Sequence, residues 1–175
     1  MKKIIIALLV CALAALPALA EGFGFREGIA WGMALEEARE AEDMANAEVE
    51  REAGFDVLEI EDVEVNGFPC DLEYFFRDDA LMACTCDYGT EDGAGFDALL
   101  DALTAAHGAP EPDADPERWR VLEDILYGEM DDRPADSFAC WTLEDGTFIA
   151  LVEDAGDASI TLGFYDELKL VESYL

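Results

Sequence analysis

The sequence predicts an α+β fold, in which two tandem repeats each consist of one helix followed by three antiparallel strands. Three observations predict it. Apolar residues recur with a helical period in two stretches, each stretch is followed by segments that alternate apolar and polar residues, and turn signals separate those segments. Apolar residues make up 52% of the 175-residue chain, which is enough for a core. We expect each antiparallel sheet to pack one face on its helix.

The first repeat is expected over residues 21–92 and opens with an amphipathic helix from Leu35 to about Ala53, which Gly54 ends. Three alternating segments follow, at 58–65, 70–76 and 81–88. Their connections carry turn signals, since Asn-Gly is typical of a two-residue hairpin loop and an Asp-Asp pair favours a second turn. The helix prediction rests on apolar positions three and four residues apart: Leu35, Ala38, Ala41, Ala45 and Val49.

The second repeat is expected over residues 93–175. Apolar positions from Phe96 to His107 predict its helix, and Gly108 with Pro110 ends it. An acidic insertion at 111–136 reads as a long connection with a short helix of its own. Alternating segments then predict three strands, and the tail is expected to form a helical turn or two. The strands are placed at 138–143, 148–152 and 159–165, and the tail at 166–175.

Residues 1–20 have the features of a secretory signal peptide: Lys2 and Lys3, an apolar stretch at 4–16, and a small-x-small site. Cleavage is expected between Ala20 and Glu21, which would place the protein outside the cytoplasm, either secreted or in the periplasm or cell envelope. The alternatives are a lipid attached to Cys11, a retained anchor and a core helix. No other segment is long and apolar enough to span a bilayer.

The net charge of −32, about −34 after loss of the signal, indicates the kind of partner. Such a surface repels nucleic acid and anionic lipid, and it attracts basic proteins, basic peptides or loosely held divalent ions. The alternative is that the acids only solvate the protein. A calcium loop at Asp113, Asp115 and Glu117 lacks the glycine and the final glutamate of that motif, so no metal site is predicted.

Four cysteines remain after cleavage, and an even number in an exported chain favours two disulfides over free buried thiols or a metal site. We expect Cys70 to pair with Cys84 or Cys86, because their strands meet across one turn whose loop length leaves the register open. Cys140 would then pair with the remaining cysteine and tie the repeats together.

No catalytic residues are predicted, and no cofactor motif is present. The sole histidine, His107, lies on the apolar helix face, where packing is the simpler role. A phosphate-binding glycine loop is missing, and only one lysine, Lys169, follows the signal. Among the aromatic residues, Trp31 and Trp141 fit the core. Trp119, in the acidic insertion, is the candidate binding residue, since tryptophan is common at protein interfaces.

Three short motifs carry a resemblance to known exported bacterial proteins. They are the 25–38 stretch with its Trp-Gly-Met turn, the Tyr74-x-Phe76-x-Asp-Asp-x-Leu81 hairpin, and Leu103-x-x-x-His107-Gly108-x-Pro110. Their layout resembles the tandem repeats of beta-lactamase inhibitor protein and the single domain of SmpA/OmlA outer-membrane lipoproteins. Ala34 departs from the serine usual before the first helix. Loss of that cap costs about 1 kcal/mol.

The resemblance implies a binding or scaffolding role without catalytic machinery. The sequence therefore predicts an exported, non-catalytic binding or inhibitor-like module whose target is a protein or peptide. A cell-envelope assembly or scaffold protein is the first alternative, and a carboxylate-based hydrolase is the second. If the two sheets join edge to edge, their outer faces would form a broad acidic surface, where a ligand is expected.

Overall fold

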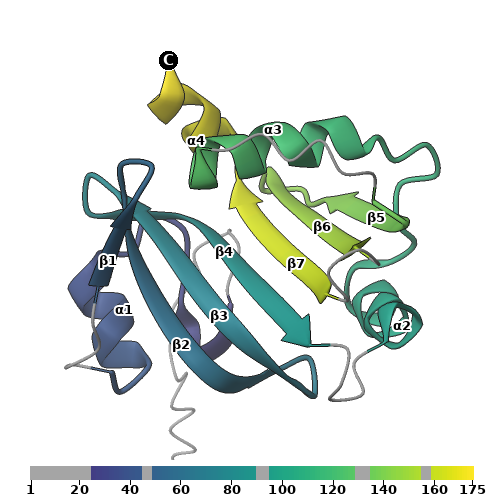
Figure 1. The fold of residues 1–175 in the computed structure, drawn as a ribbon, viewed down its shortest axis with the longest axis horizontal. Helices are drawn as coiled ribbons and strands as arrows, with labels where there is room; N and C mark the ends of the chain where they lie inside the picture. Colours follow the sequence, from purple (N-terminus) through teal and green to yellow (C-terminus); the bar gives the residue numbers. More distant parts are fainter. Residues whose placement is uncertain (1–24, 45–48, 90–94, 129–134, 155–158) are drawn as a thin grey trace, which may run out of the picture.

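A computed structural model describes residues 25–44, 49–89, 95–128, 135–154 and 159–175. Within these ranges, seven strands form one antiparallel sheet in the order β1-β2-β3-β4-β7-β6-β5 (Figure 1). The strands are β1 (Val49–Glu52), β2 (Phe55–Val65), β3 (Phe68–Arg77), β4 (Ala80–Gly89), β5 (Ser137–Thr142), β6 (Thr147–Asp154) and β7 (Ser159–Asp166). The helices are η1 (Arg26–Gly28), α1 (Leu35–Ala41), α2 (Phe96–His107), α3 (Pro116–Tyr127) and α4 (Glu167–Tyr174).

The α+β class is confirmed, but the arrangement as two helix–three-strand repeats with separate sheets is not supported. Strands β4 and β7 pair from Ala83↔Tyr165 to Gly89↔Ser159, and this pairing joins both halves into one sheet. The first half contributes four strands rather than three. The physical reason is that an open sheet edge exposes unpaired backbone groups, which edge-to-edge pairing satisfies.

The helix predicted from Leu35 to Ala53 is too long. Helix α1 ends at Ala41, and residues 49–52 form β1, which pairs with β2. Ala53 and Gly54 both have positive φ angles, 46° and 89°, and form the two-residue turn of this hairpin. An alanine face buries little apolar surface, so tertiary pairing outweighs the helical pattern here. Residues 45–48 lie outside the described ranges.

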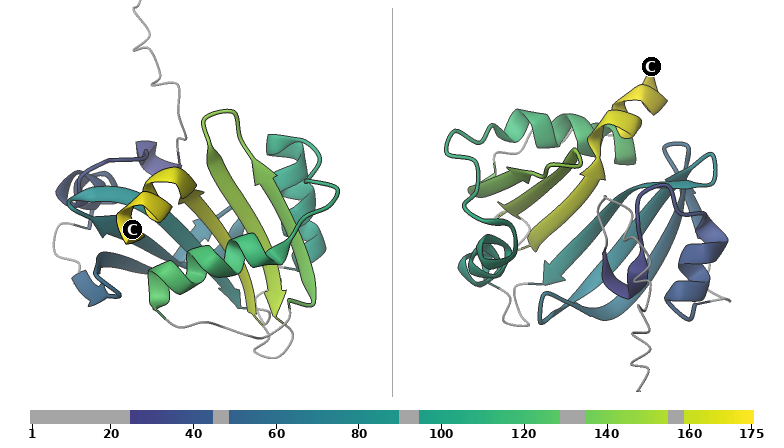
Figure 2. Two further views of the ribbon diagram at one scale, coloured as in Figure 1. Left: turned by 90° about the horizontal axis from the view of Figure 1, so that it is seen from above. Right: turned by 180° about the vertical axis from the view of Figure 1, so that it is seen from behind.

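Helices cover both faces of the sheet (Figures 1 and 2). Ala38 of α1 and Leu99 and Leu103 of α2 belong to one buried cluster with one face of the strands. Leu122 of α3 and Leu170 of α4 belong to a second cluster on the opposite face. We call this second face the outer face. No described helix is long and apolar enough to cross a membrane.

The β3–β4 turn replaces the helix cap that Ala34 cannot provide. The backbone N–H of Leu35 donates to Asp79 Oδ1 at 3.1 Å, and the backbone N–H of Ala34 donates to the Glu37 carboxylate at 3.2 Å. The first residues of α1 therefore have side-chain acceptors although Ala34 has none. This contact also fixes α1 against the hairpin that follows it.

The acidic insertion contains a longer helix than its short-helix prediction. Helix α3 begins after Asp115, whose side chain accepts from the Glu117 N–H at 3.0 Å, and Pro116 takes the first helical position. Gly128 ends the helix in the left-handed conformation, with φ 72°. The tail forms α4, so its predicted helical turns are confirmed.

Arg118 of α3 holds α4 in place. Its guanidinium donates to both carboxylate oxygens of Glu167, at 2.7 and 2.5 Å, and lies 4.0 Å from the centre of the Phe148 ring. A bidentate pair of this kind fixes geometry as well as adding energy. The two helices on the outer face are thus tied to one another and to β6.

Candidate acidic groove

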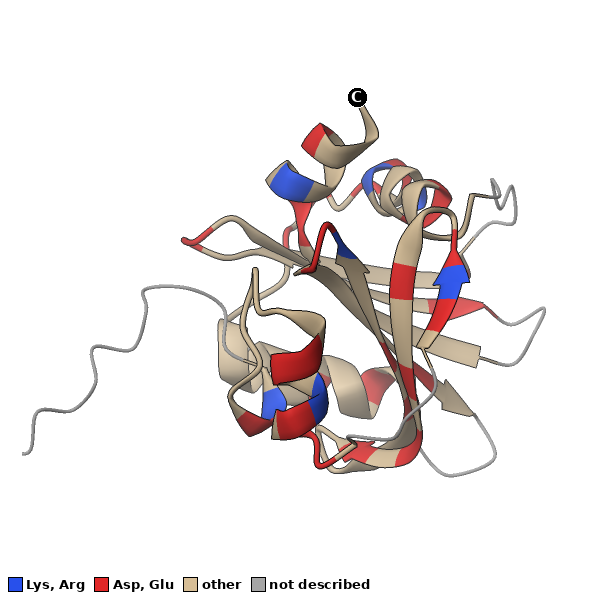
Figure 3. Cartoon of the chain, turned by 90° about the vertical axis from the view of Figure 1, so that its left-hand side faces the viewer, with Lys and Arg blue, Asp and Glu red and all other residues tan. Residues whose placement is uncertain are grey.

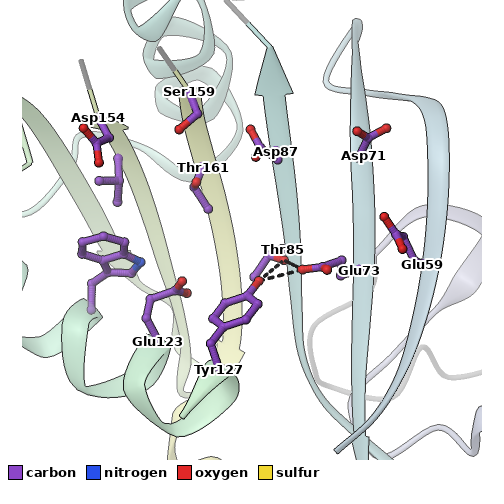
Figure 4. Close-up of a pocket in the computed structure, with 12 residues that line it drawn as sticks. Glu59, Asp71, Glu73, Thr85, Asp87, Glu123, Tyr127, Asp154, Ser159 and Thr161 are labelled. Carbon is purple, nitrogen blue, oxygen red and sulfur yellow. Dashed lines mark hydrogen bonds between the residues drawn. The ribbon is translucent and has the colours of Figure 1, made fainter. Parts of the chain in front are cut away.

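The outer face is hollowed into a groove of about 410 Å³ between α3 and strands β2–β4 (Figure 4). We call it the acidic groove. Strands and a helix that are distant in the sequence supply its walls. It is lined by Glu59, Asp71, Glu73, Thr85, Asp87, Trp119, Glu123, Tyr127, Val152, Asp154, Ser159 and Thr161.

Strand register arranges the floor of the acidic groove in rows. Glu59 and Glu73 lie directly opposite one another on β2 and β3, and we call this pair row A. Asp71 and Asp87 lie opposite one another on β3 and β4, and we call this pair row B. Since Asp71 and Glu73 are two residues apart, both rows project from the same face of the sheet.

Each of these strands changes from apolar to acidic along the outer face. Val57 precedes Glu59 on β2, and Phe75 follows Glu73 on β3. Both apolar side chains are buried in the cluster that also contains residues of α3 and α4. On β4 the buried Ala83 precedes Thr85. The alternation of the strands therefore continues past the end of the apolar core and places acids beside α3.

The charge of the groove is one-sided: among the described residues, its lining contains six carboxylates and no lysine, arginine or histidine. Figure 3 shows how acidic residues outnumber basic ones on the drawn chain. Like charges directly opposite one another destabilise a sheet. Partial burial, and then the Glu73 carboxylate, raise the pKa of Glu59. Partial burial, and then Asp71, raise the pKa of Asp87.

Tyr127 of α3 reaches across the groove and holds row A. Its hydroxyl donates to Glu73 Oε2 at 2.6 Å, and the buried Thr85 hydroxyl donates to the same oxygen at 3.1 Å. Burial, and then the Glu123 and Glu73 carboxylates, raise the pKa of Tyr127, so its hydroxyl stays a donor. Glu73 is thereby fixed in one orientation.

A second tyrosine positions the carboxylate on the helical wall. The Tyr165 hydroxyl donates to Glu123 Oε1 at 2.6 Å, and the Tyr165 side chain is fully buried. It lies over Gly163 of the same strand, where an added Cβ would overlap the hydroxyl oxygen. Only glycine fits at position 163, because any larger side chain would collide with Tyr165. The glycine thus allows Tyr165 to reach Glu123.

A β-bulge in β2 orients row B. The pairing of β2 with β3 shifts between Ile60 and Val63, and Asp62 in this bulge has a φ angle of 56°. The Asp62 backbone N–H donates to Asp71 Oδ1 at 3.1 Å. The bulge thus supplies a backbone donor to one of the carboxylates in the floor.

The candidate binding residue Trp119 lies in the wall of the acidic groove. The other two tryptophans belong to the core, as expected: Trp141 is buried, and Trp31 packs against the cluster under α1 and α2. The acids of rows A and B were not among the residues selected from the sequence. The signal that could have found them is the acidic alternate position in each of three consecutive strands.

The four cysteines within the described ranges, Cys70, Cys84, Cys86 and Cys140, are buried free thiols rather than the expected disulfides. Cys86 lies opposite Leu72, and Asp87 opposite Asp71, so Cys70 and Cys86 are diagonal neighbours on the face that α1 and α2 cover. Cys140 lies on the outer face. A bond from it to Cys84 or Cys86 would have to cross the sheet, so the structure does not support that pairing.

The remaining candidates do not assemble into a site. His107 ends α2 as a largely exposed residue, and partial desolvation of its ring lowers its pKa. Of the calcium-loop residues, Asp115 caps α3, and Glu117 pairs with Arg120 at 3.2 Å. Among the described residues, no group of three or more histidine, cysteine or acidic side chains is placed to hold a metal ion.

Comparison with protein-family models, with curated proteins and with solved structures gave no match. The likeness to beta-lactamase inhibitor protein and to the SmpA/OmlA lipoproteins therefore rests on the short motifs described above.

Proposed function

We propose that the protein is an exported, non-catalytic binding module that takes a basic segment of a partner protein into the acidic groove. The observation that supports this most is the lining of the groove, in which the described residues include six carboxylates and no cationic side chain. A cationic ligand would relieve the repulsion within rows A and B. Complementary charge of this kind raises the rate of encounter and the specificity of binding.

The groove is prepared for a ligand before binding. Tyr127 and Thr85 hold Glu73, and Tyr165 holds Glu123, so these two carboxylates have fixed orientations. Fixing these side chains in advance reduces the conformational entropy lost when a partner binds. Trp119 and Tyr127 add aromatic surface, on which cationic side chains can also pack.

Isothermal titration calorimetry with octalysine tests this function, with octaglutamate as the control ligand. Glu73→Gln combined with Asp87→Asn removes two charges from the groove but keeps side-chain size. Asp101→Asn combined with Glu144→Gln removes two exposed charges elsewhere and is the matched control. We expect the groove variant to bind octalysine about tenfold or more weakly than the control variant, since each lost charge pair weakens binding. Equal binding by both variants would contradict the proposal.

Export is the second part of the proposal, and it rests on residues 1–20, which lie outside the described ranges. The mature protein is expected to start at Glu21 without lipid. N-terminal sequencing and intact mass of exported material test this directly. A chain that starts at Cys11 and carries acyl mass would show a lipoprotein instead, and retention of that form in the envelope would favour the scaffold alternative.

A further inference from the structure

We propose that the occupant of the acidic groove is an extended basic segment with lysine or arginine at alternate positions. This inference rests on the proposed function and specifies the conformation and the residue spacing of the ligand. The acidic groove lies on the outer face beside α3, and charge complementarity requires a cationic occupant. The arrangement of the carboxylates in rows indicates the spacing that the cations of the ligand must have.

The spacing of the rows matches an extended chain. Asp71 and Glu73 are two residues apart on β3, so rows A and B are about 6.8 Å apart along the strand. A ligand in the extended conformation presents alternate side chains on one side at the same interval of about 6.8 Å. A segment that runs along β3 would thus place one cation over each row. Adjacent cations would instead point to opposite sides, and only one of them would reach the acids.

The shape of the groove favours the same occupant. One wall is helix α3, whose Tyr127 reaches Glu73 on β3, so little space separates the helix from the rows. A helical ligand has a diameter of about 10–12 Å with its side chains, whereas an extended chain is narrower. In Figure 4, Glu59, Glu73, Asp71 and Asp87 lie on the floor, and Glu123 and Tyr127 project from α3. The ligand would lie between these two sets.

The experiment compares three ligands of equal charge per molecule by calorimetry at 50 mM NaCl. The first is an octapeptide with lysine and serine alternating. The second repeats the order Lys-Lys-Ser-Ser twice, so that no two of its lysines are two residues apart, and the third is spermine. We expect the alternating peptide to bind about 1.4- to 5-fold more tightly than the paired-lysine peptide, which corresponds to one additional favourable charge pair. Trp119 fluorescence is expected to change on binding, and Trp119→Phe identifies its signal among the three tryptophans.

The preference for alternating lysines should disappear in the Glu73→Gln, Asp87→Asn variant and persist in the Asp101→Asn, Glu144→Gln control. Circular dichroism of both variants shows that they are folded. If the two peptides bind equally, and the groove variant still weakens both, the extended conformation is wrong but the proposed function stands. Equal or tighter binding of spermine would make a small polyamine the occupant and overturn this inference. Failure of all three ligands, and of octalysine, would overturn the proposed function itself.

Discussion

Asp87→Asn is expected to stabilise the protein, because it removes one charge of a like-charged pair in row B. Asp71 lies directly opposite Asp87, and such a pair costs about 0.2–1 kcal/mol. In a chain of this length each kcal/mol shifts the melting temperature by about 2–4 °C, so the gain should be about 0.4–4 °C. Thermal unfolding followed by circular dichroism at low salt measures it. Asp101→Asn, an exposed change on α2 with the same net charge, is the control.

The pH dependence of this gain provides a stricter test. The pKa of Asp87 is raised in the folded protein, so ionisation of Asp87 weakens the folded state as the pH rises through that pKa. The asparagine variant lacks this loss. Its advantage should therefore be complete at pH 7 and vanish below about pH 3.9, the ordinary pKa of aspartate. An advantage independent of pH, or a gain no larger than that of Asp101→Asn, would refute the reasoning.

Four further predictions concern other parts of the structure. Gly163→Ala should destabilise the protein by about 1–3 kcal/mol in chemical denaturation, since the new Cβ would displace Tyr165; unchanged stability would contradict it. Oxidation should join Cys70 to Cys86 and add about 3 kcal/mol to the free energy of unfolding, which peptide mapping and chemical denaturation check. Alkylation of all four thiols in the unreduced, denatured protein would contradict it. Arg118→Met should cost about 1–2 kcal/mol and loosen α4 in hydrogen exchange. Sodium chloride should raise the melting temperature, because the screening length falls from about 30 Å at 0.01 M to about 10 Å at 0.1 M. A saturable further rise with calcium at equal ionic strength would instead indicate a specific site.

Local patterns predicted most of the strands and one helix well. The Asn66-Gly67 signal marks the β2–β3 turn, and helix α2 has the expected bounds of Phe96 and His107. Gly54 was misread, because a glycine with a positive φ angle suits a helix end and a hairpin turn equally. The apolar spacing of the preceding residues favours the helix over the hairpin. Only the pairing of β1 with β2, which the local spacing does not reveal, decides between a helix end and a hairpin turn.

The candidate site depended on contacts that the sequence does not encode locally. The sequence predicts an acidic surface only on the condition that two sheets join edge to edge, and the β4–β7 pairing meets that condition. The hairpin turn alone would set Glu59 opposite Tyr74, and the β-bulge between Ile60 and Val63 shifts the register so that Glu59 faces Glu73. The position of α3 over the sheet is not encoded locally either, because an amphipathic helix can pack on either face. Tyr127 therefore had no visible link to Glu73 before the fold was known.

The junction of β4 with β7 has a consequence for how the chain folds. Every other strand pair in the described sheet joins neighbours along the sequence, whereas β4–β7 joins residues 70 to 82 positions apart. Contacts between distant residues form slowly, so we expect two meanders that form early and dock late. Until docking, β4 and β7 are open edges on which other copies could add. The net charge of −32 keeps such intermediates apart at low salt. Salt that strengthens the native protein should therefore lower its refolding yield.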